Sequence, residues 1–317
     1  MGVRMDFEGA YEKVDELRAN IEKVMVGKRH VVDVAMTCLL AEGHLLVEDV
    51  PGVGKSMLAK SIARSIEACN KRIQFTPDLL PSDITGAQIY NQKSEEFVFC
   101  RGPVFANIVL ADEINRATPR TQSSLLEAME EKQVTVDGNT YELERPFFVI
   151  GTQNPIEFEG TYPLPISQLD RFMMKTSFGY MEHDDEVRML RERRSKMPID
   201  QLEPVVSVED ICQLQDLVRE IKVDDSLYGY VVNVVAATRK SEQLALGASP
   251  RTTLRMFRAA QATAMVNHRA YMIPDDVKAV ARPVLGHRVI VKAPVQYKGH
   301  PSETVLDDIL TQVVVPY

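Results

Sequence analysis

A glycine-rich loop followed by lysine and serine is the strongest chemical signal in the chain, at residues 50–56, Val-Pro-Gly-Val-Gly-Lys-Ser. It follows an apolar run at 44–47 that predicts a strand, and it precedes a helical pattern at 55–68. In that context the glycines let backbone N–H groups converge on phosphate oxygens, and the positive end of the helix dipole faces the same charge. We expect Lys55 to reach the β- and γ-phosphates of a nucleoside triphosphate and the Ser56 hydroxyl to bind Mg²⁺.

One position departs from the general phosphate-loop pattern, which places glycine where this chain has Asp49. The later glycines, the lysine and the serine are intact, so we still expect a nucleotide to bind. The alternative is a glycine-rich turn between a strand and a helix that holds no ligand.

Two carboxylates, Asp112 and Glu113, follow a second apolar run at 108–111. Ligands bind beyond the carboxyl ends of strands in open α/β sheets, so these acids would face the phosphates. We expect Asp112 to hold Mg²⁺ through water and Glu113 to orient the attacking water or accept its proton. Two adjacent acids alone are usually surface charge, but these follow a buried strand downstream of a phosphate loop. The expected ATP-binding residues are Pro51, Gly52, Val53, Gly54, Lys55, Ser56, Met57 and Asp112, and the expected metal-binding pair is Ser56 and Asp112.

Polar residues also end a third apolar run, at 147–151, which continues as Thr-Gln-Asn-Pro. We expect the asparagine, Asn154, to help position the attacking water. Asn-Pro is also an ordinary turn signal, and without the other motifs the turn would be the better interpretation.

An arginine supplied by a neighbouring subunit could complete the site. Arg171 stands at a predicted helix end before the last strand, where it could project into the neighbour's pocket. Such an arginine finger is worth ~10³–10⁵ in rate. The alternative is a surface ion pair between Asp170 and Arg171. Arg116 and Arg120 are rival candidates for the finger.

A further arginine, Arg251, follows a Ser-Pro helix start. We expect its guanidinium and the helix dipole to face the γ-phosphate bound to the same subunit. The expected catalytic residues are therefore Glu113, Asn154, Arg171 and Arg251.

Short apolar runs alternate with helical patterns over the first 180 residues. Several runs are apolar on both faces, which is typical of a parallel sheet covered by helices. Helices are predicted at 55–68 and 119–131, the second starting with Thr-Pro. This alternation predicts an α/β fold. The predicted strands cover 44–47, 72–75, 108–111, 147–151 and 173–178.

Two β-hairpins interrupt this rhythm, at 87–99 and 133–143. The first surrounds a polar Asn-Gln-Lys-Ser tip. The second contains Asp-Gly between two β-rich runs, which favours a tight turn.

Helices dominate after residue 179, and we place a domain boundary near 179–183. Residues 1–180 would form the nucleotide-binding core, and residues 184–317 a helical lid. Serine and proline start signals support these helices. The predicted lid helices cover 184–196, 207–220, 225–240, 250–268 and 275–284.

Composition bounds the remaining possibilities. The chain has 317 residues, is 45% hydrophobic and carries a net charge of -8, so we expect a globular protein without general attraction to nucleic acid. The four cysteines contain no Cys-x-x-Cys pair and the six histidines show no ligand spacing, which argues for a reducing compartment and against protein-bound zinc. No apolar run predicts a membrane helix or a signal peptide, so we expect a cytoplasmic location.

Several motifs around the acids resemble the signature of the MoxR family of AAA+ ATPases. The resemblance spans residues 20 to 290 and rests on specific segments. These segments are Leu-Leu-Pro-Ser-Asp-Ile-Thr-Gly at 79–86, Asp-Glu-Ile-Asn-Arg-Ala at 112–117, Gln-Ser-Ser-Leu-Leu-Glu-Ala-Met-Glu-Glu at 122–131, Thr-Gln-Asn-Pro-Ile-Glu at 152–157, Gly-Thr-Tyr-Pro-Leu-Pro at 160–165 and Gln-Leu-Asp-Arg-Phe at 168–172.

The resemblance implies a P-loop NTPase core with strand order 5-1-4-3-2 and a C-terminal helical lid. The strand that leads to Asn154 would lie between the two motif strands, and the hairpins would be the helix-2 insert and the pre-sensor hairpin. The resemblance further implies a hexameric ring, chaperone-like work on protein clients, and partners with von Willebrand factor A domains.

Three functions remain open at this point. The leading hypothesis is an ATP-driven remodeller, in which hydrolysis shifts the lid against the core. A DNA-linked motor is the second, because relatives with the same insert include helicases, but the pI of 5.4 and the scarcity of basic residues in the hairpins count against it. A nucleotide-dependent assembly switch is the third, and the intact Glu113 counts against it.

Overall fold

The computed structural model describes residues 4–50, 52–93, 95–155, 160–192, 197–293 and 302–316. Pro51, which we expect to contact the nucleotide, lies outside the described residues. So does the Ile-Glu end of the family motif at 152–157, together with the end of the helix expected at 184–196.

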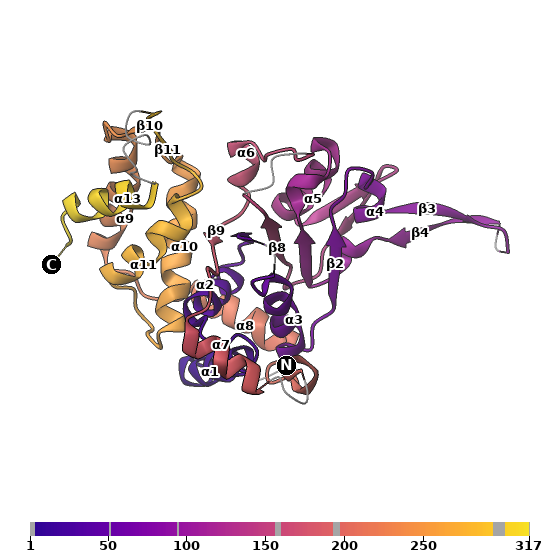
Figure 1. Ribbon diagram of the computed structural model, residues 1–317, viewed down its shortest axis with the longest axis horizontal. Helices are drawn as coiled ribbons and strands as arrows, with labels where there is room; N and C mark the ends of the chain where they lie inside the picture. Colours follow the sequence, from indigo (N-terminus) through magenta and orange to yellow (C-terminus); the bar gives the residue numbers. More distant parts are fainter. Residues whose placement is uncertain are drawn as a thin grey trace.

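A parallel sheet of five strands forms the centre of the larger part of the molecule (Figure 1). Its spatial order is β2-β5-β8-β1-β9, which reads 5-1-4-3-2 when these strands are numbered along the chain, so the expected order is confirmed. The strand that leads to Asn154 does lie between the two motif strands. The strands are β1 (Leu45–Glu48), β2 (Asn70–Gln74), β5 (Ile108–Asp112), β8 (Phe148–Gln153) and β9 (Met174–Thr176).

Helices cover both faces of this sheet because its strands are apolar on both sides. On β5, Ile108 and Leu110 belong to one buried cluster, whereas Val109 and Ala111 belong to a second. The first cluster includes residues of α1 (Phe7–Glu22), α2 (Arg29–Leu40) and α3 (Lys55–Ser65), and the second includes residues of α4 (Pro81–Thr85) and α5 (Pro119–Glu131).

Both expected hairpins are present. The Asp137-Gly138 turn of the second has φ values of 49° and 80°, as a tight hairpin turn requires. The rings of Phe99 and Tyr141 stack with centroids 4.3 Å apart and join the two hairpins. The first hairpin extends from the body as a narrow arm (Figure 1). The hairpin strands are β3 (Gly86–Asn91) with β4 (Glu96–Arg101), and β6 (Gln133–Val136) with β7 (Asn139–Glu142).

Helices make up most of the second half of the chain, as expected, and most of them lie beside the β9 edge of the sheet (Figure 1). α8 packs on α2, where the Gln215 side chain donates a hydrogen bond to Leu39 O. No helix within the described ranges is long and apolar enough to cross a membrane. The helices are α7 (His183–Glu192), α8 (Val208–Val218), α9 (Asp225–Lys240), α10 (Pro250–Val266), α11 (Pro274–Leu285) and α13 (Ser302–Gln312).

Short elements connect these parts. A two-stranded antiparallel pair lies among the lid helices. The short elements are η1 (Pro103–Phe105), η2 (Ile114–Arg116), α6 (Ile166–Leu169), η3 (Pro198–Gln201), β10 (Leu244–Leu246) and β11 (Ile290–Val291).

Two buried histidines join elements that are distant in sequence. His44 Nδ1 accepts the backbone N–H of Val149, so Nε2 carries the proton that faces Met129 O at 3.1 Å. Burial lowers the pKa of His44 to about 4 and lowers the pKa of His287 well below its usual value. Both rings are therefore neutral in the folded protein.

We expect these histidines to make folding sensitive to acid. The unfolded state takes up protons below pH 6.5, whereas folded His44 resists protonation until about pH 4. Stability is therefore full above pH 6.5 and falls as the pH drops toward 4, by about 3 kcal/mol for one such group. Urea unfolding at pH 7.5, 6, 5 and 4.5 measures this slope. His44→Asn should flatten it, whereas His30→Asn, at an exposed position, should not. An unchanged slope in His44→Asn would contradict the assignment.

Candidate functional site

The glycine-rich loop has the backbone geometry of a phosphate cradle. Gly52 and Gly54 have φ values of 85° and 110°, which side-chain-bearing residues rarely adopt, and Gly54 begins α3. The buried Lys55 Nζ donates to Asp49 O at 2.7 Å, across the mouth of the loop. Gly52, Gly54, Lys55 and Ser56 line one cavity, so the N-terminus of α3 and the Lys55 ammonium lie at the same space.

Asp49 has a structural role that explains its presence in place of glycine. Its Oδ2 accepts the backbone N–H groups of Phe178 and Gly179 at 2.6 and 2.8 Å. Lys28 binds the carbonyl groups of the same turn. Its Nζ donates to Phe178 O and Tyr180 O at 2.7 and 2.8 Å. A glycine at 49 would leave those two N–H groups without this acceptor. Sequence spacing gave no signal for Lys28.

A largely apolar cavity of about 330 Å³ lies beside the loop. It is bounded by residues 24–26, by the turn at 179–181 and by α7, and it shares Gly52, Gly54 and Met57 with the phosphate loop. Its position next to the cradle suits the flat apolar faces of a nucleobase. Met57 and Val53, two of the residues expected to bind the nucleotide, line it.

A second cavity of about 330 Å³ brings together most of the residues expected to contact the phosphates and the metal. Arg72, which the sequence interpretation missed, also lines it. The lining residues are Gly52, Gly54, Lys55, Ser56, Met57, Arg72, Asp112, Glu113 and Asn154.

The Asp112 carboxylate is held from two neighbouring strands. Thr152 Oγ1 on β8 donates to Asp112 Oδ1 at 2.6 Å. Arg72 on β2 donates to Asp112 Oδ2 from Nη2 at 2.6 Å and from Nε at 3.1 Å. The carboxylate is thus fixed at the carboxyl end of β5, facing the cavity that Ser56 lines.

Glu113 is held in an unusual backbone conformation. Its φ of 57° and ψ of 49° lie in the left-handed region, which costs of order 1–3 kcal/mol for a residue other than glycine. The backbone N–H of Glu113 donates to Thr152 Oγ1 at 2.9 Å, and Gln74 Nε2 donates to Glu113 Oε2 at 2.8 Å. Arg116 Nε lies 3.3 Å from the same oxygen. These contacts aim the carboxylate and restrain it.

The residues of this cavity fit a magnesium ion that arrives with a nucleotide. Mg²⁺ is usually bound by one or two carboxylates together with substrate phosphates rather than by an all-protein cage. Ser56 and the buried Asp112 supply one hydroxyl and one carboxylate to the lining of this cavity. Within the part of the chain that the structure describes, no cluster of three or more His, Cys, Asp or Glu residues could hold a metal alone.

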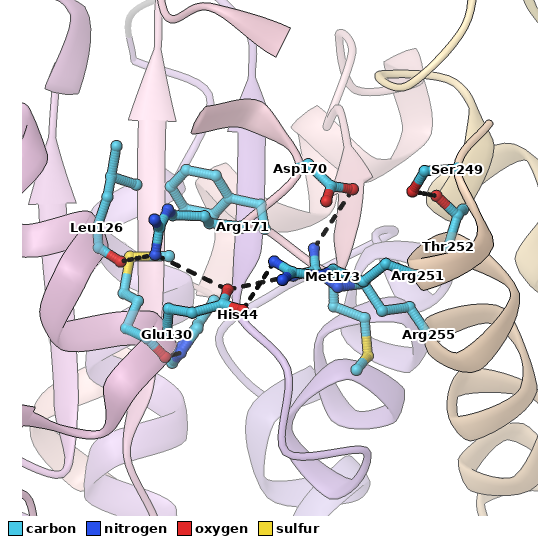
Figure 2. Close-up of polar contacts among 12 residues, drawn as sticks. His44, Leu126, Glu130, Asp170, Arg171, Met173, Ser249, Arg251, Thr252 and Arg255 are labelled. Carbon is cyan, nitrogen blue, oxygen red and sulfur yellow. Dashed lines mark hydrogen bonds and ion pairs between the residues drawn. The ribbon is translucent and has the colours of Figure 1, made fainter. Parts of the chain in front are cut away.

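Arg171 and Arg251, two of the arginines singled out in the sequence, lie outside this cavity and around Glu130 near the end of α5 (Figure 2). Arg251 Nη1 lies 2.8 Å from Glu130 Oε1, and Arg171 Nη1 lies 3.9 Å from Glu130 Oε2. Arg255 lies between Glu130 and Asp170, at 3.4 and 3.7 Å. The surface-pair alternative for Arg171 differs from what the structure shows, since the Asp170 carboxylate pairs with Arg255 and Arg288 instead.

This arginine cluster lies at the opposite edge of the sheet from the phosphates. His44, just before β1, contacts Met129 O next to Glu130, so the end of α5 lies at the amino ends of the strands. At about 1.5 Å per residue, Glu130 is roughly 17 Å along the helix from its start near the acids. The expectation that Arg251 faces the pocket of its own subunit is therefore wrong in this structure. The reason is that α10 packs against α2 and α11. This packing places the first turn of α10, which carries Arg251, away from the cavity.

Comparisons with known proteins agree with this geometry. The model for the ATPase family associated with various cellular activities (AAA) matches residues 44–174, and the AAA lid domain model matches 236–309. An uncharacterised Bacillus subtilis protein, YeaC, is 50% identical over 94% of this chain and 93% of its own length. Chaperone MoxR1 of Mycobacterium tuberculosis is 42% identical, over 93% of this chain and 80% of its own. The crystal structure of a candidate ATPase from Cytophaga hutchinsonii has a TM-score of 0.91 at 37% identity and covers 98% of this chain and 97% of that chain.

A covered parallel sheet of this order, with a phosphate loop, an acid pair and a helical lid, defines an AAA+ ATPase. The chain belongs to the MoxR family of these enzymes, as its motifs predict. It binds nucleotide and hydrolyses ATP.

Thr152 links the two acids, so its hydroxyl should matter for turnover. Thr152→Val keeps the shape but removes the donor to Asp112 and the acceptor for the Glu113 N–H. We expect a loss of about 1–3 kcal/mol in unfolding free energy and a kcat about tenfold lower, equivalent to about 1.4 kcal/mol. Urea unfolding and steady-state phosphate release measure both. Thr263→Val, whose hydroxyl bonds a carbonyl of its own helix, is the control and should keep its kcat. A kcat for Thr152→Val within twofold of wild type would contradict this role.

Proposed function

We propose that this ATPase is Mg²⁺-dependent and uses hydrolysis to remodel client proteins. The observation that carries the proposal is the single cavity in which Lys55, Ser56, Asp112, Glu113 and Asn154 meet. Residues 51–57 bind the phosphates and the base side of the nucleotide, and Ser56 and Asp112 hold the metal. When bound, Mg²⁺ neutralises charge on the phosphates.

In this proposal the chain itself moves the proton and positions the water. Glu113 accepts a proton from the attacking water, and Asn154, buried at the end of β8, orients that water. Gln74 and Arg116 contact the Glu113 carboxylate in the described structure, so these contacts must loosen before Glu113 can act on water. Lys55 leaves Asp49 O and contacts the phosphates.

We further propose that subunits assemble into a hexameric ring in which Arg171 acts on the nucleotide of a neighbour. Arg171 and Arg251 share Glu130 at the edge of the sheet away from their own cavity, which supports action across an interface for both. Arg116 is a weaker candidate for the finger, because it already contacts Glu113 of its own chain. Arg120 is exposed in the first turn of α5 and is the remaining rival.

The hairpin arm formed by β3 and β4 is our proposed client contact. Its side chains Ile89, Tyr90, Phe97 and Val98 are large, apolar and exposed, with Phe97 at 68%. One relative is named a chaperone, which supports work on proteins rather than on nucleic acid. A partner with a von Willebrand factor A domain and a cytoplasmic location, which the free thiols suit, belong to the same proposal.

Two variants test the assigned chemistry. Lys55→Ala should lose nucleotide binding because it removes the ammonium from the cradle, and calorimetry with ATP measures this. Glu113→Gln should bind ATP normally yet turn it over at least about 100-fold more slowly, as loss of a general base predicts. Lys60→Ala, an exposed lysine on the same helix, is the control for lost charge. Normal phosphate release by Glu113→Gln would refute the proposal.

Mixing two inactive variants tests action between subunits. Arg171→Ala should be slow but bind ATP, whereas Lys55→Ala should bind none yet retain its arginine. If Arg171 acts on a neighbour, a mixture places intact arginines beside intact pockets, and part of the ATPase activity should return. Activity no higher than the sum of the two separate proteins would exclude Arg171 as the shared finger. The same mixture made with Arg120→Ala or Arg251→Ala ranks the other candidates.

A further inference from the structure

Arg72 occupies a position for which the proposed chemistry has no assigned role. It belongs to β2, its side chain is 54% exposed, and it lines the phosphate cavity. In the parallel register of β2 and β5 it is opposite Leu110, so its side chain reaches two residues along the sheet to Asp112. Its Nε and Nη2 both donate to Asp112 Oδ2, at 3.1 and 2.6 Å.

Thr152 and Arg72, the two side chains that donate to Asp112, differ in how easily their hydrogen bonds to it can be broken. Thr152 is fully buried, and its hydroxyl bonds both Asp112 Oδ1 and the Glu113 backbone. The half-exposed Arg72 side chain can turn into the cavity without uncovering apolar core. Mg²⁺ held through water needs a lone pair of Asp112 as acceptor for that water. Oδ2 is the oxygen that becomes available when Arg72 moves.

Arg72 also connects the two acids. Its Nη2 donates to Gln74 Oε1 at 2.6 Å, and Gln74 Nε2 donates in turn to Glu113 Oε2 at 2.8 Å. The guanidinium therefore orients the amide that restrains Glu113. Departure of Arg72 from Asp112 removes that orienting donor and loosens the hold on Glu113.

We propose that Arg72 is the resident cation of Asp112, that it would give up this carboxylate when Asp112 helps to hold Mg²⁺, and that its departure would release Glu113 for catalysis. The inference rests on the Mg²⁺–ATP chemistry proposed above. A cation is needed there because an isolated carboxylate as buried as Asp112 is costly. Arg72 is thus a positioning residue. In this proposal Glu113 stays restrained while Arg72 pairs with Asp112, and it is released when the metal takes the place of Arg72.

Equilibrium binding of ADP, first in EDTA and then with increasing Mg²⁺, tests the exchange without requiring turnover. In Arg72→Met, Asp112 has lost its cation, so metal-free ADP should bind several-fold more weakly and the half-saturating Mg²⁺ concentration should fall. We expect the ratio of Kd without metal to Kd with metal to rise about tenfold, equivalent to about 1.4 kcal/mol. Lys71→Met, the exposed neighbour on the same strand, should leave the ratio unchanged.

A second pair of variants assigns the effect to Asp112. In an Asp112→Asn background the carboxylate is absent, so Arg72→Met should no longer alter the ratio. Arg72→Gln removes the charge but keeps a hydrogen-bond donor, and it carries the test if the methionine variant does not fold.

The outcomes separate this inference from the proposal beneath it. Suppose that the wild-type protein binds ADP with a Kd that depends on Mg²⁺. If the Arg72 variants then keep the wild-type ratio of the two Kd values, or lose affinity equally with and without metal, Arg72 is a structural residue and the inference is overturned. If wild-type binding shows no metal dependence, the proposed Mg²⁺ chemistry fails first.

Discussion

The Asp112 carboxylate connects three adjacent strands of the sheet through hydrogen bonds with side chains of the two neighbouring strands. β5 carries it, Thr152 on β8 fixes one oxygen, and Arg72 on β2 holds the other. A parallel sheet makes this possible because the carboxyl ends of all its strands lie at one edge. The same edge receives the phosphate loop after β1, so the strand order is what turns separate motifs into one cavity.

The turn at 178–180 ties this cavity to the second half of the chain. Asp49 holds the turn through its backbone N–H groups, and Lys28 holds it through its carbonyls. Asp49 O also accepts the Lys55 ammonium, the group expected to meet the phosphates. If Lys55 exchanges Asp49 O for a phosphate, as proposed above, the change occurs at the same residue whose carboxylate anchors the chain leading to α7 and the lid. The aspartate that departs from the usual loop sequence therefore contacts both the Lys55 ammonium and the turn that leads to α7.

Local backbone chemistry explains which features could be predicted from sequence. The phosphate loop, the acid pair after an apolar run and the Asp-Gly hairpin each depend on a few consecutive residues, and each is present in the structure. Arg72, Gln74, Thr152 and Lys28 gave no comparable signal because their partners lie 39 to 152 positions away along the chain. The orientation assigned to Arg251 was wrong because it depends on how α10 packs against α2 and α11. A helix start signal shows where a helix begins in sequence but not which edge of the sheet it faces.

The separation between the cavity and the arginine cluster constrains how such a chain can assemble. The cavity opens at the carboxyl edge of the sheet, and Glu130 gathers three arginines at the amino edge. In the ring proposed above these two different surfaces would meet through a heterologous interface, which closes when the rotation between subunits permits. Glu130 pairs with these arginines within one subunit, so in the proposed ring they would exchange one anionic partner for another. The electrostatic cost of bringing arginines to a neighbour's phosphate would then be limited to the difference between these two partners.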